Sequence, residues 1–141
     1  MVLPERYRDV PAFSFGDSPH MADSGLADVI ARRQTATCGS LEILRRPDRF
    51  EPFEGALEIV FDGRGEPGCV IRTFKVAIRQ FDEIDEEFAR EEACIDLAQR
   101  REIHEAYFRR LAVFSPDMKL VCQYFDVVDI FGKHRGKADK P

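Results

Sequence analysis

Two threonines, two residues apart, are the first side chains in this chain whose types and spacing suit chemistry. Thr35 and Thr37 lie in a run of small and β-branched residues, Thr35–Cys38, which predicts a short strand. Residues two apart on a strand share one face, so both hydroxyls would point into the same cleft. Thr37 would serve there as a hydrogen-bonding group or a weak nucleophile. The alternative is that both are ordinary strand formers.

The acidic residues are concentrated in one segment. Asp82–Glu92 contains seven acidic residues and one basic residue, Arg90, so the charge of this segment is −6. The net charge of the whole chain is −5, and the charge of the remaining residues is therefore +1. Glu92 closes this run, and such runs are mostly solvated faces. The 16 arginines outnumber the 5 lysines, and the planar guanidinium suits phosphates and stacked bases. The alternative is a set of ordinary surface arginines.

The cysteines and histidines do not predict a metal site. Cys38, Cys69, Cys94 and Cys122 lie about thirty residues apart without a C-x-x-C pair, and the three histidines are equally scattered. We therefore expect four reduced cysteines, no metal and no organic cofactor. No apolar run reaches the ~18 residues of a membrane span, and the first residues do not resemble a signal peptide, so a cytoplasmic location without membrane contact is expected.

The elements that would position these residues are those of an α+β domain. Ser18 and Pro19 predict a helix start, with an apolar face as far as Arg33. Residues 39–52 form an irregular crossing segment. Leu57–Phe61 and Cys69–Arg79 flank a dense turn signal and predict a hairpin. Asp82–Glu92 predicts a short helix, Asp96 and Gln99 begin the next one, and Lys119–Val128 predicts a closing strand.

Four blocks, in this order, resemble the ASCH domain family. The match spans about Phe13 to Val128, and its blocks are Phe15–Pro19, Ala31–Cys38, Phe81–Glu92, and Phe114–Met118 running into Val121–Cys122. The resemblance implies a PUA-like fold, a small mixed β-barrel with flanking α-helices, and a cleft associated with RNA or modified nucleosides. The expected division is an N-terminal arm at residues 1–12, an ASCH domain at 13–130 and a disordered basic tail at 131–141.

Some small ASCH proteins are amidohydrolases that act on 4-N-acetylcytidine, and their pattern implies roles for residues here. It uses a lysine in a G-x-K-T-x-T segment, the second threonine and a glutamate on the acidic helix. The threonine maps to Thr37 and the glutamate to Glu92, but Gln34 stands at the lysine position and Arg32 at the glycine. A lysine can shed its proton or hold an oxyanion, whereas glutamine can only form hydrogen bonds. The resemblance therefore implies that this chemistry is lost or altered.

Three further side chains carry weaker expectations. His104, on an apolar helix face, is expected to be a core histidine with satisfied hydrogen bonds. Arg100 stands where related sequences tend to carry tryptophan, and it is either a ligand-facing guanidinium or a surface substitution. Arg32 and Arg33 end the first predicted helix and would contact phosphate at the rim of the cleft.

The expected function is binding of RNA, a nucleoside or a nucleotide in a cleft. Gln34, Thr35, Arg32 and Arg33 would bind the ligand, and Glu92 and Thr37 would be the catalytic groups if any hydrolysis survives. The alternative function is amidohydrolysis of 4-N-acetylcytidine or a related N-acylated nucleoside. A ribonuclease is a third alternative without a distinctive residue set.

Overall fold

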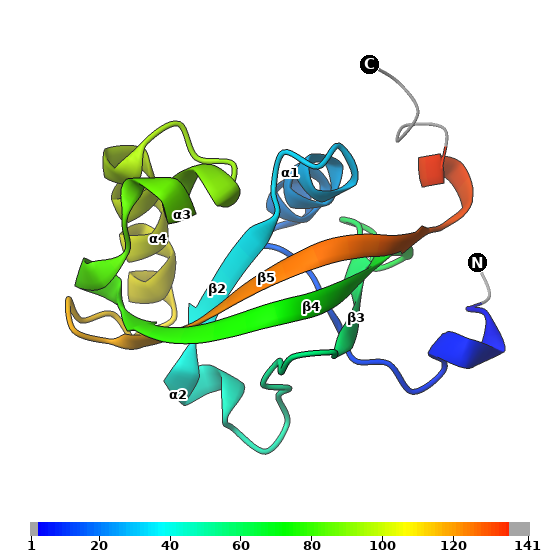
Figure 1. The fold of residues 1–141 in the computed structure, drawn as a ribbon, viewed down its shortest axis with the longest axis horizontal. Helices are drawn as coiled ribbons and strands as arrows, with labels where there is room; N and C mark the ends of the chain where they lie inside the picture. The colour runs from blue at the N-terminus through cyan, green and yellow to red at the C-terminus, as the bar shows by residue number, and fades with distance from the viewer. Residues whose placement is uncertain (1–2, 136–141) are drawn as a thin grey trace.

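The computed structural model describes residues 3–135. In chain order, its elements are a 3-10 helix Glu5–Tyr7, β1 Ala12–Phe13, α1 Pro19–Ile30, β2 Ala36–Ser40, α2 Leu41–Leu44, β3 Leu57–Phe61, β4 Pro67–Gln80, a 3-10 helix Phe81–Glu83, α3 Glu86–Glu91, α4 Leu97–Arg110, β5 Lys119–Ile130 and a 3-10 helix Gly132–His134 (Figure 1). Among these residues, no helix has both the length and the apolar character needed to cross a membrane.

One five-stranded mixed sheet organises the chain, with the strand order β1-β3-β4-β5-β2. Three antiparallel ladders join β3, β4, β5 and β2, and β1 adds a short parallel pair to β3. The α+β prediction is confirmed. Among the described residues, β1 and β2 are the two edge strands of the sheet and do not pair with each other. The sheet is therefore open, and the closed barrel that the resemblance implies is not seen.

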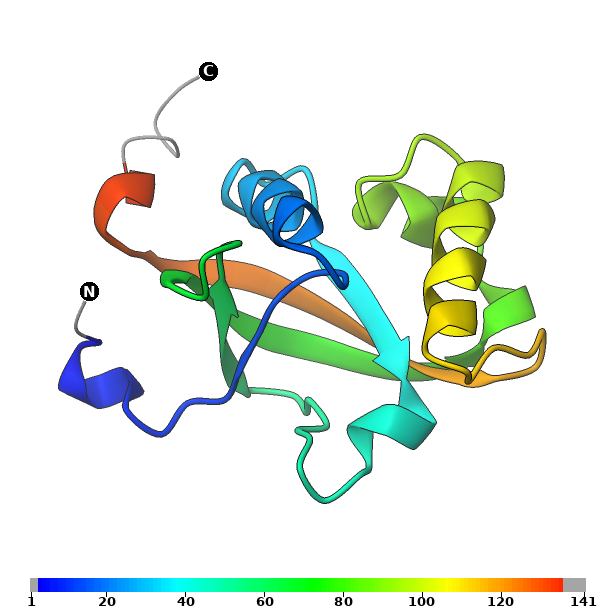
Figure 2. The same ribbon diagram turned by 180° about the vertical axis from the view of Figure 1, so that it is seen from behind.

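The helices pack around this sheet as two groups. In Figure 1 and, from behind, in Figure 2, α1 lies on one side of β2, and α3 and α4 lie on the other. Leu26, Val29 and Ile30 of α1 pack against buried residues of β3, β4 and β5. Phe88 of α3 and Phe108 of α4 belong to a second core with the other end of the sheet. The strip of β2 between the two helix groups carries the site described below.

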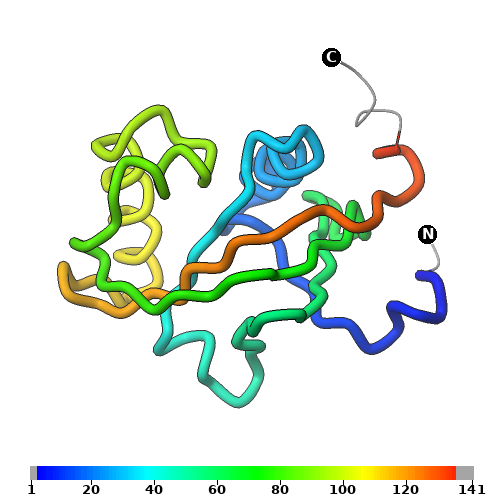
Figure 3. Tube along the Cα trace, viewed as in Figure 1, coloured from blue at the N-terminus to red at the C-terminus, as the bar shows by residue number. Residues whose placement is uncertain are grey.

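The sheet is buried on both faces near the β3–β4 hairpin. Val60 and Ile71 belong to the core under α1, whereas Ile59 and Val70 pack with Tyr7 on the opposite face. Neighbouring residues of a strand point to opposite faces, so burial of both explains the continuous apolar runs of these strands. The chain trace in Figure 3 shows the initial and final 3-10 helices at this end of the molecule.

The local predictions differ from the structure at several boundaries. The Ser18 hydroxyl accepts the Met21 N–H at 3.2 Å, which confirms the cap, but α1 ends at Ile30 and not at Arg33. Arg32 has φ of 61°, a left-handed conformation that a helix cannot continue through. The crossing segment contains the short helix α2, and the acidic segment is a 3-10 turn followed by α3.

The two predicted ends of the chain are also partly structured. Within the expected arm, Tyr7 is buried and packs edge-on against Phe131 with ring centroids 5.7 Å apart. Within the expected tail, Gly132–His134 form a 3-10 helix and His134 is buried. The remainder of that tail, residues 136–141, lies outside the described residues.

Candidate functional site

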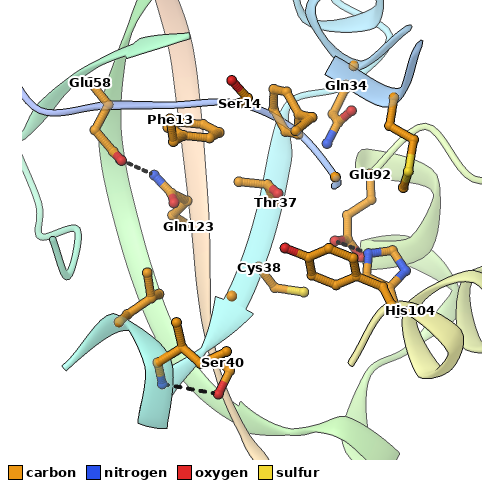
Figure 4. Close-up of a pocket in the computed structure, with 18 of the residues that line it drawn as sticks. Phe13, Ser14, Gln34, Thr37, Cys38, Ser40, Glu58, Glu92, His104 and Gln123 are labelled. Atoms are coloured by element: carbon orange, nitrogen blue, oxygen red, sulfur yellow. Dashed lines mark hydrogen bonds and ion pairs between the residues drawn. The ribbon is translucent and has the colours of Figure 1, made fainter. Parts of the chain in front are cut away.

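A pocket of about 1050 Å³ opens over β2, between α1 and α4. Aromatic side chains contribute part of its lining, among them Phe13, Phe15 and Tyr107. Polar side chains contribute the rest, and Figure 4 shows two polar pairs on opposite sides of it, Glu58 with Gln123 and Glu92 with His104. Thr37 and Cys38 of β2 lie between these pairs.

Glu92 is held by two basic side chains of α4. Arg100 Nε donates to Glu92 Oε1 at 2.7 Å, and His104 Nε2 lies 3.3 Å from Glu92 Oε2. Arg100 is fully buried and Glu92 is 6% exposed, whereas the His104 side chain is 19% exposed. His104 is thus the member of this trio that meets the solvent of the pocket.

The position of Glu92 follows from the turn between α3 and α4. Glu92 is the C-cap of α3, and its backbone forms an isolated antiparallel bridge with Gln34, which ties the acidic segment to the strand leading into β2. Ala93 then adopts φ of 62°, which redirects the chain. Asp96 caps α4 by accepting the Gln99 N–H at 2.8 Å. Arg100 and His104, four residues apart on α4, therefore face the same carboxylate.

The protonation of this trio is set by its contacts. Burial by itself raises the pKa of Glu92, but the hydrogen bond and charge of His104 and the charge of Arg100 outweigh burial, so the pKa of Glu92 is lowered. His104 Nδ1 lies 2.9 Å from the Arg100 carbonyl oxygen, which can only accept, so this nitrogen carries a proton. Its other nitrogen, Nε2, is the one that faces Glu92 Oε2, at 3.3 Å.

The opposite side of the pocket holds a buried carboxyl with an amide partner. Gln123 Nε2 donates to Glu58 Oε1 at 2.8 Å and to the Thr73 hydroxyl at 2.9 Å. Burial raises the pKa of Glu58 to about 7, against a smaller lowering by Gln123. Gln123 lies directly opposite Thr37 in the β2–β5 ladder. Thr37, Gln123, Thr73 and Glu58 thus form a polar row across four strands.

The residues predicted for the site divide into two sets. Gln34, Thr37 and Glu92 line the pocket together. Gln34 is buried, and its amide donates to the Ala36 carbonyl at 3.1 Å. Thr35, Arg32 and Arg33 are exposed and are not among the lining residues. Thr35 directly precedes β2 and is exposed, whereas Thr37, within β2, lines the pocket.

The two arginines beside the pocket have local partners. Arg33 Nε donates to Asp28 at 2.9 Å, and Asp28 lines the pocket, which places Arg33 near the rim. Arg32 donates to the Ile30 carbonyl at 2.8 Å. Neither contact buries the guanidinium.

Cys38, Glu92 and His104 form the cluster best suited by residue type to a metal ion. One donor atom from each lies within 4.8 Å of the others. Arg100 already contacts two of the three, because its Nη2 also donates to Cys38 Sγ at 3.2 Å. Burial raises the pKa of the Cys38 thiol well above its usual value, and metals bind the thiolate. The guanidinium of Arg100 therefore already supplies a positive charge to this cluster, and a metal ion would place a second positive charge beside it.

Several site residues were missed or misplaced by sequence reasoning. Arg100 is neither a surface substitution nor ligand-facing, because it is fully buried behind Glu92 and lies 5.4 Å from the Phe81 ring centroid. His104 is more than a core histidine, because it lines the pocket. Glu58 carried one signal, because it is the single polar residue of the apolar strand Leu57–Phe61. Gln123 carried none, because its strand Lys119–Ile130 contains other polar residues.

Comparison with known proteins identifies the family. The ASCH domain model matches residues 11–129. This chain belongs to the ASCH domain family. It is similar to the crystal structure of protein EF3133 from Enterococcus faecalis V583, with 35% identity over 99% of this chain and 83% of that one and a TM-score of 0.79. An ASCH domain from Lactobacillus crispatus JV V101 shows 26% identity over 89% and 83%, with a TM-score of 0.77.

A more distant structure shares the fold alone. The ASCH protein from Zymomonas mobilis shows 10% identity over 89% of this chain and 73% of that one, with a TM-score of 0.51. Comparison with functionally curated proteins finds no match. The family prediction is confirmed, and the function has to be argued from the pocket.

Proposed function

We propose that this ASCH domain binds RNA or a modified nucleoside, with one nucleoside seated in the pocket over β2. The observation that carries the proposal is the lining, which combines the polar row Thr37, Gln123 and Glu58 with the aromatic rings of Phe13 and Phe15. Single nucleosides are recognised by stacking on aromatic rings and by hydrogen bonds to base edges. The volume of about 1050 Å³ lies just above the range of roughly 300–1000 Å³ that is typical of small-ligand pockets.

Two exposed arginines beside this pocket support the RNA form of the proposal. Arg33 is exposed and adjoins the pocket-lining Gln34, and Arg32 is exposed one residue earlier. A nucleotide chain entering the pocket along this edge would bring its phosphates to both guanidinium groups. Thr35, equally exposed, would lie beside the same chain.

Binding of short single-stranded RNA and of free nucleosides to the full chain tests this proposal. Labelled RNA is titrated at low salt and again at 200 mM salt, and nucleosides are titrated by calorimetry under the same conditions. RNA binding is expected to weaken steeply with salt, and nucleoside binding to change little, because only phosphate contacts release counterions. Replacing Arg32 and Arg33 together by alanine should flatten the salt dependence. If neither RNA nor nucleosides bind at low salt, the proposal fails.

Hydrolysis of an N-acylated cytidine is the second candidate, favoured by the contact between the buried Glu92 and the half-buried His104 at the pocket. Water would add to the acyl carbon, the C–N bond would break, and the proton lost by the water would pass through this pair to the leaving nitrogen, giving a carboxylic acid and the free amine. Thr37 would hold the acyl oxygen by a hydrogen bond. Gln34 cannot take up the proton that a lysine would, and Arg100 cannot replace it because a guanidinium does not deprotonate.

Acetate release from 4-N-acetylcytidine tests this second candidate. The wild type is compared with Glu92→Ala and Gln34→Lys. Turnover by the wild type that is abolished in Glu92→Ala supports hydrolysis. An unchanged rate in Glu92→Ala excludes Glu92 as a catalytic residue. Activity that arises only in Gln34→Lys indicates a binding pocket that has lost its reactive group.

A further inference from the structure

In the described part of the chain, the middle of β4 and β5 carries no helix on the face that points away from α1. Ile71 of β4 and Phe125 of β5 pack against α1. Because neighbouring residues of a strand point to opposite faces, Arg72 and Tyr124 point away from it. In Figure 1, no helix lies in front of the middle of these two strands. We call this surface, around Arg72, Tyr124 and the residues between them on β4, the open face.

A phenylalanine protrudes from the open face. In the β4–β5 ladder Thr73 pairs with Phe125 and Lys75 pairs with Tyr124, so Phe74 is an extra residue at a β-bulge. Its side chain is 54% exposed, and its ring centroid lies 6.4 Å from that of Tyr124, with 36° between the ring planes. The bulge therefore holds two neighbouring aromatic rings at the surface of adjacent strands.

Cationic side chains lie on both sides of these rings along β4. Lys75 Nζ is 4.9 Å from the centroid of the Tyr124 ring, and Arg79 Nη1 donates to the Tyr124 hydroxyl at 2.7 Å. Arg72, two residues before Phe74, is exposed. Among residues 3–135, none of these three cations forms an ion pair with a carboxylate. Their charges are therefore available to an anionic ligand.

Acidic residues limit where such a ligand can lie. Glu91, in the last turn of α3, interacts electrostatically with Lys75 and Arg79. Asp126 lies opposite Arg72 in the ladder. Like charges repel, so an anionic chain is kept away from α3 and is directed over the stretch of β4 around Phe74.

We propose that the open face binds single-stranded nucleic acid, with one base stacked on Phe74 and the neighbouring phosphates on Lys75 and Arg72. Proteins hold single strands by stacking bases on aromatic side chains beside cations that contact the backbone. This site is separate from the pocket, because Gln123 of the pocket lies two residues from Phe125 and shares the face of α1. The inference therefore goes beyond the binding of a nucleoside.

A protein partner matches the open face less well. The core of a protein–protein interface is depleted of charged residues, and of lysine in particular. On the open face Lys75 and Arg72 lie directly beside the exposed ring of Phe74. Duplexes match it less well too, because their bases are already stacked on one another and paired.

Fluorescence anisotropy of a short labelled oligouridylate, titrated with the full chain at low salt, tests the inference. Phe74→Ala should weaken binding at least about fivefold, the worth of one stacked base, and Phe74→Trp should bind at least as tightly as the wild type. Ile78→Ala is the matched control. It shortens an apolar side chain of the same strand that is 46% exposed and points to the other face, so binding should not change.

The salt dependence tests the phosphate contacts. Lys75→Ala should lower the slope of log affinity against log salt concentration by about 0.7, the value for one phosphate of a single strand. Arg64→Ala removes an exposed cation of the β3–β4 turn and should leave the slope unchanged. Thermal unfolding of each variant confirms that it is folded.

The outcomes separate this site from the pocket. Phe74→Ala should leave nucleoside binding in calorimetry unchanged, and a folded Phe74→Ala protein that loses nucleosides as well contradicts a separate site. If Phe74→Ala binds the oligouridylate as the wild type does, the open face is not the binding surface and the pocket proposal stands. If a duplex or an oligoglutamate of the same length binds as tightly as the oligouridylate, the surface recognises charge alone and the inference is wrong. It is also wrong if the wild type does not bind the oligouridylate, whereas the nucleoside titrations still decide on the pocket.

Discussion

The buried carboxyl of Glu58 predicts an unusual dependence of stability on pH. Its folded pKa of about 7 lies above the ordinary value of 4.5, so the folded chain holds a proton that the unfolded chain releases between these values. The unfolded state then binds fewer protons, and stability falls as pH rises through this window. At pH values above 7 both states are ionised, and the full cost of burying the charge remains.

The magnitude follows from the same two values. One pKa unit corresponds to 1.36 kcal/mol, so Glu58 alone should cost the folded state about 2–3 kcal/mol more at pH 8 than at pH 5. Glu58→Gln removes the titration and keeps the size and the bond from Gln123. We therefore expect the free energy of unfolding of this variant, relative to the wild type, to rise by about 2–3 kcal/mol between these pH values.

Urea unfolding of both proteins at pH 5 and pH 8 measures this difference, and the comparison cancels all groups that titrate alike in both. Glu54→Gln, at an exposed position, is the matched control and should show no such change. A difference between Glu58→Gln and the wild type that is the same at both pH values would refute the reasoning, because Glu58 would then ionise as an ordinary carboxyl.

Two further predictions concern the other side of the pocket. Arg100→Met leaves Glu92 buried without its closest cation and should lower the free energy of unfolding by about 3–5 kcal/mol in urea titrations. Arg33→Met, which removes an exposed ion pair, should lower it by less than about 1 kcal/mol. Similar small losses in both variants would contradict the stabilising role of the buried pair. Thr37→Val should weaken nucleoside binding by about fivefold in calorimetry, the worth of one hydrogen bond, while Thr35→Val should leave it unchanged. A larger effect at Thr35 would show that the ligand does not enter the pocket.

The fold was largely predictable because its signals are local. The Ser18 cap, the hairpin turn and the alternation in the closing strand each fix an element through neighbouring residues, and β3 occupies the predicted residues. The end of α1 was missed because Arg32 is a residue that seldom adopts a positive φ. The pairing of β1 with β3 was not predicted, because it joins two residues of an irregular segment to a strand more than forty positions away.

The residues of the site could be predicted only where they lie close together in the sequence. Gln34, just before β2, and Thr37, within it, lie three residues apart, and both line the pocket. The buried pairs join distant segments: Glu58 meets Gln123 across 65 residues, and Cys38 meets Arg100 across 62. Spacing in the sequence carries no information on such contacts. Burial of Arg100 also runs against the usual exposure of arginine, so only the folded chain reveals that it compensates Glu92.

The central claim is that a nucleoside occupies the pocket over β2, and a nuclear magnetic resonance titration tests it most directly. Cytidine and 4-N-acetylcytidine are added separately to the ¹⁵N-labelled full chain, and changes in amide chemical shift are mapped. We predict that at least one of them produces saturable changes centred on Thr37, Cys38 and Gln123. No change with either compound, or changes confined to the opposite face around Tyr7 and Phe131, would contradict the claim.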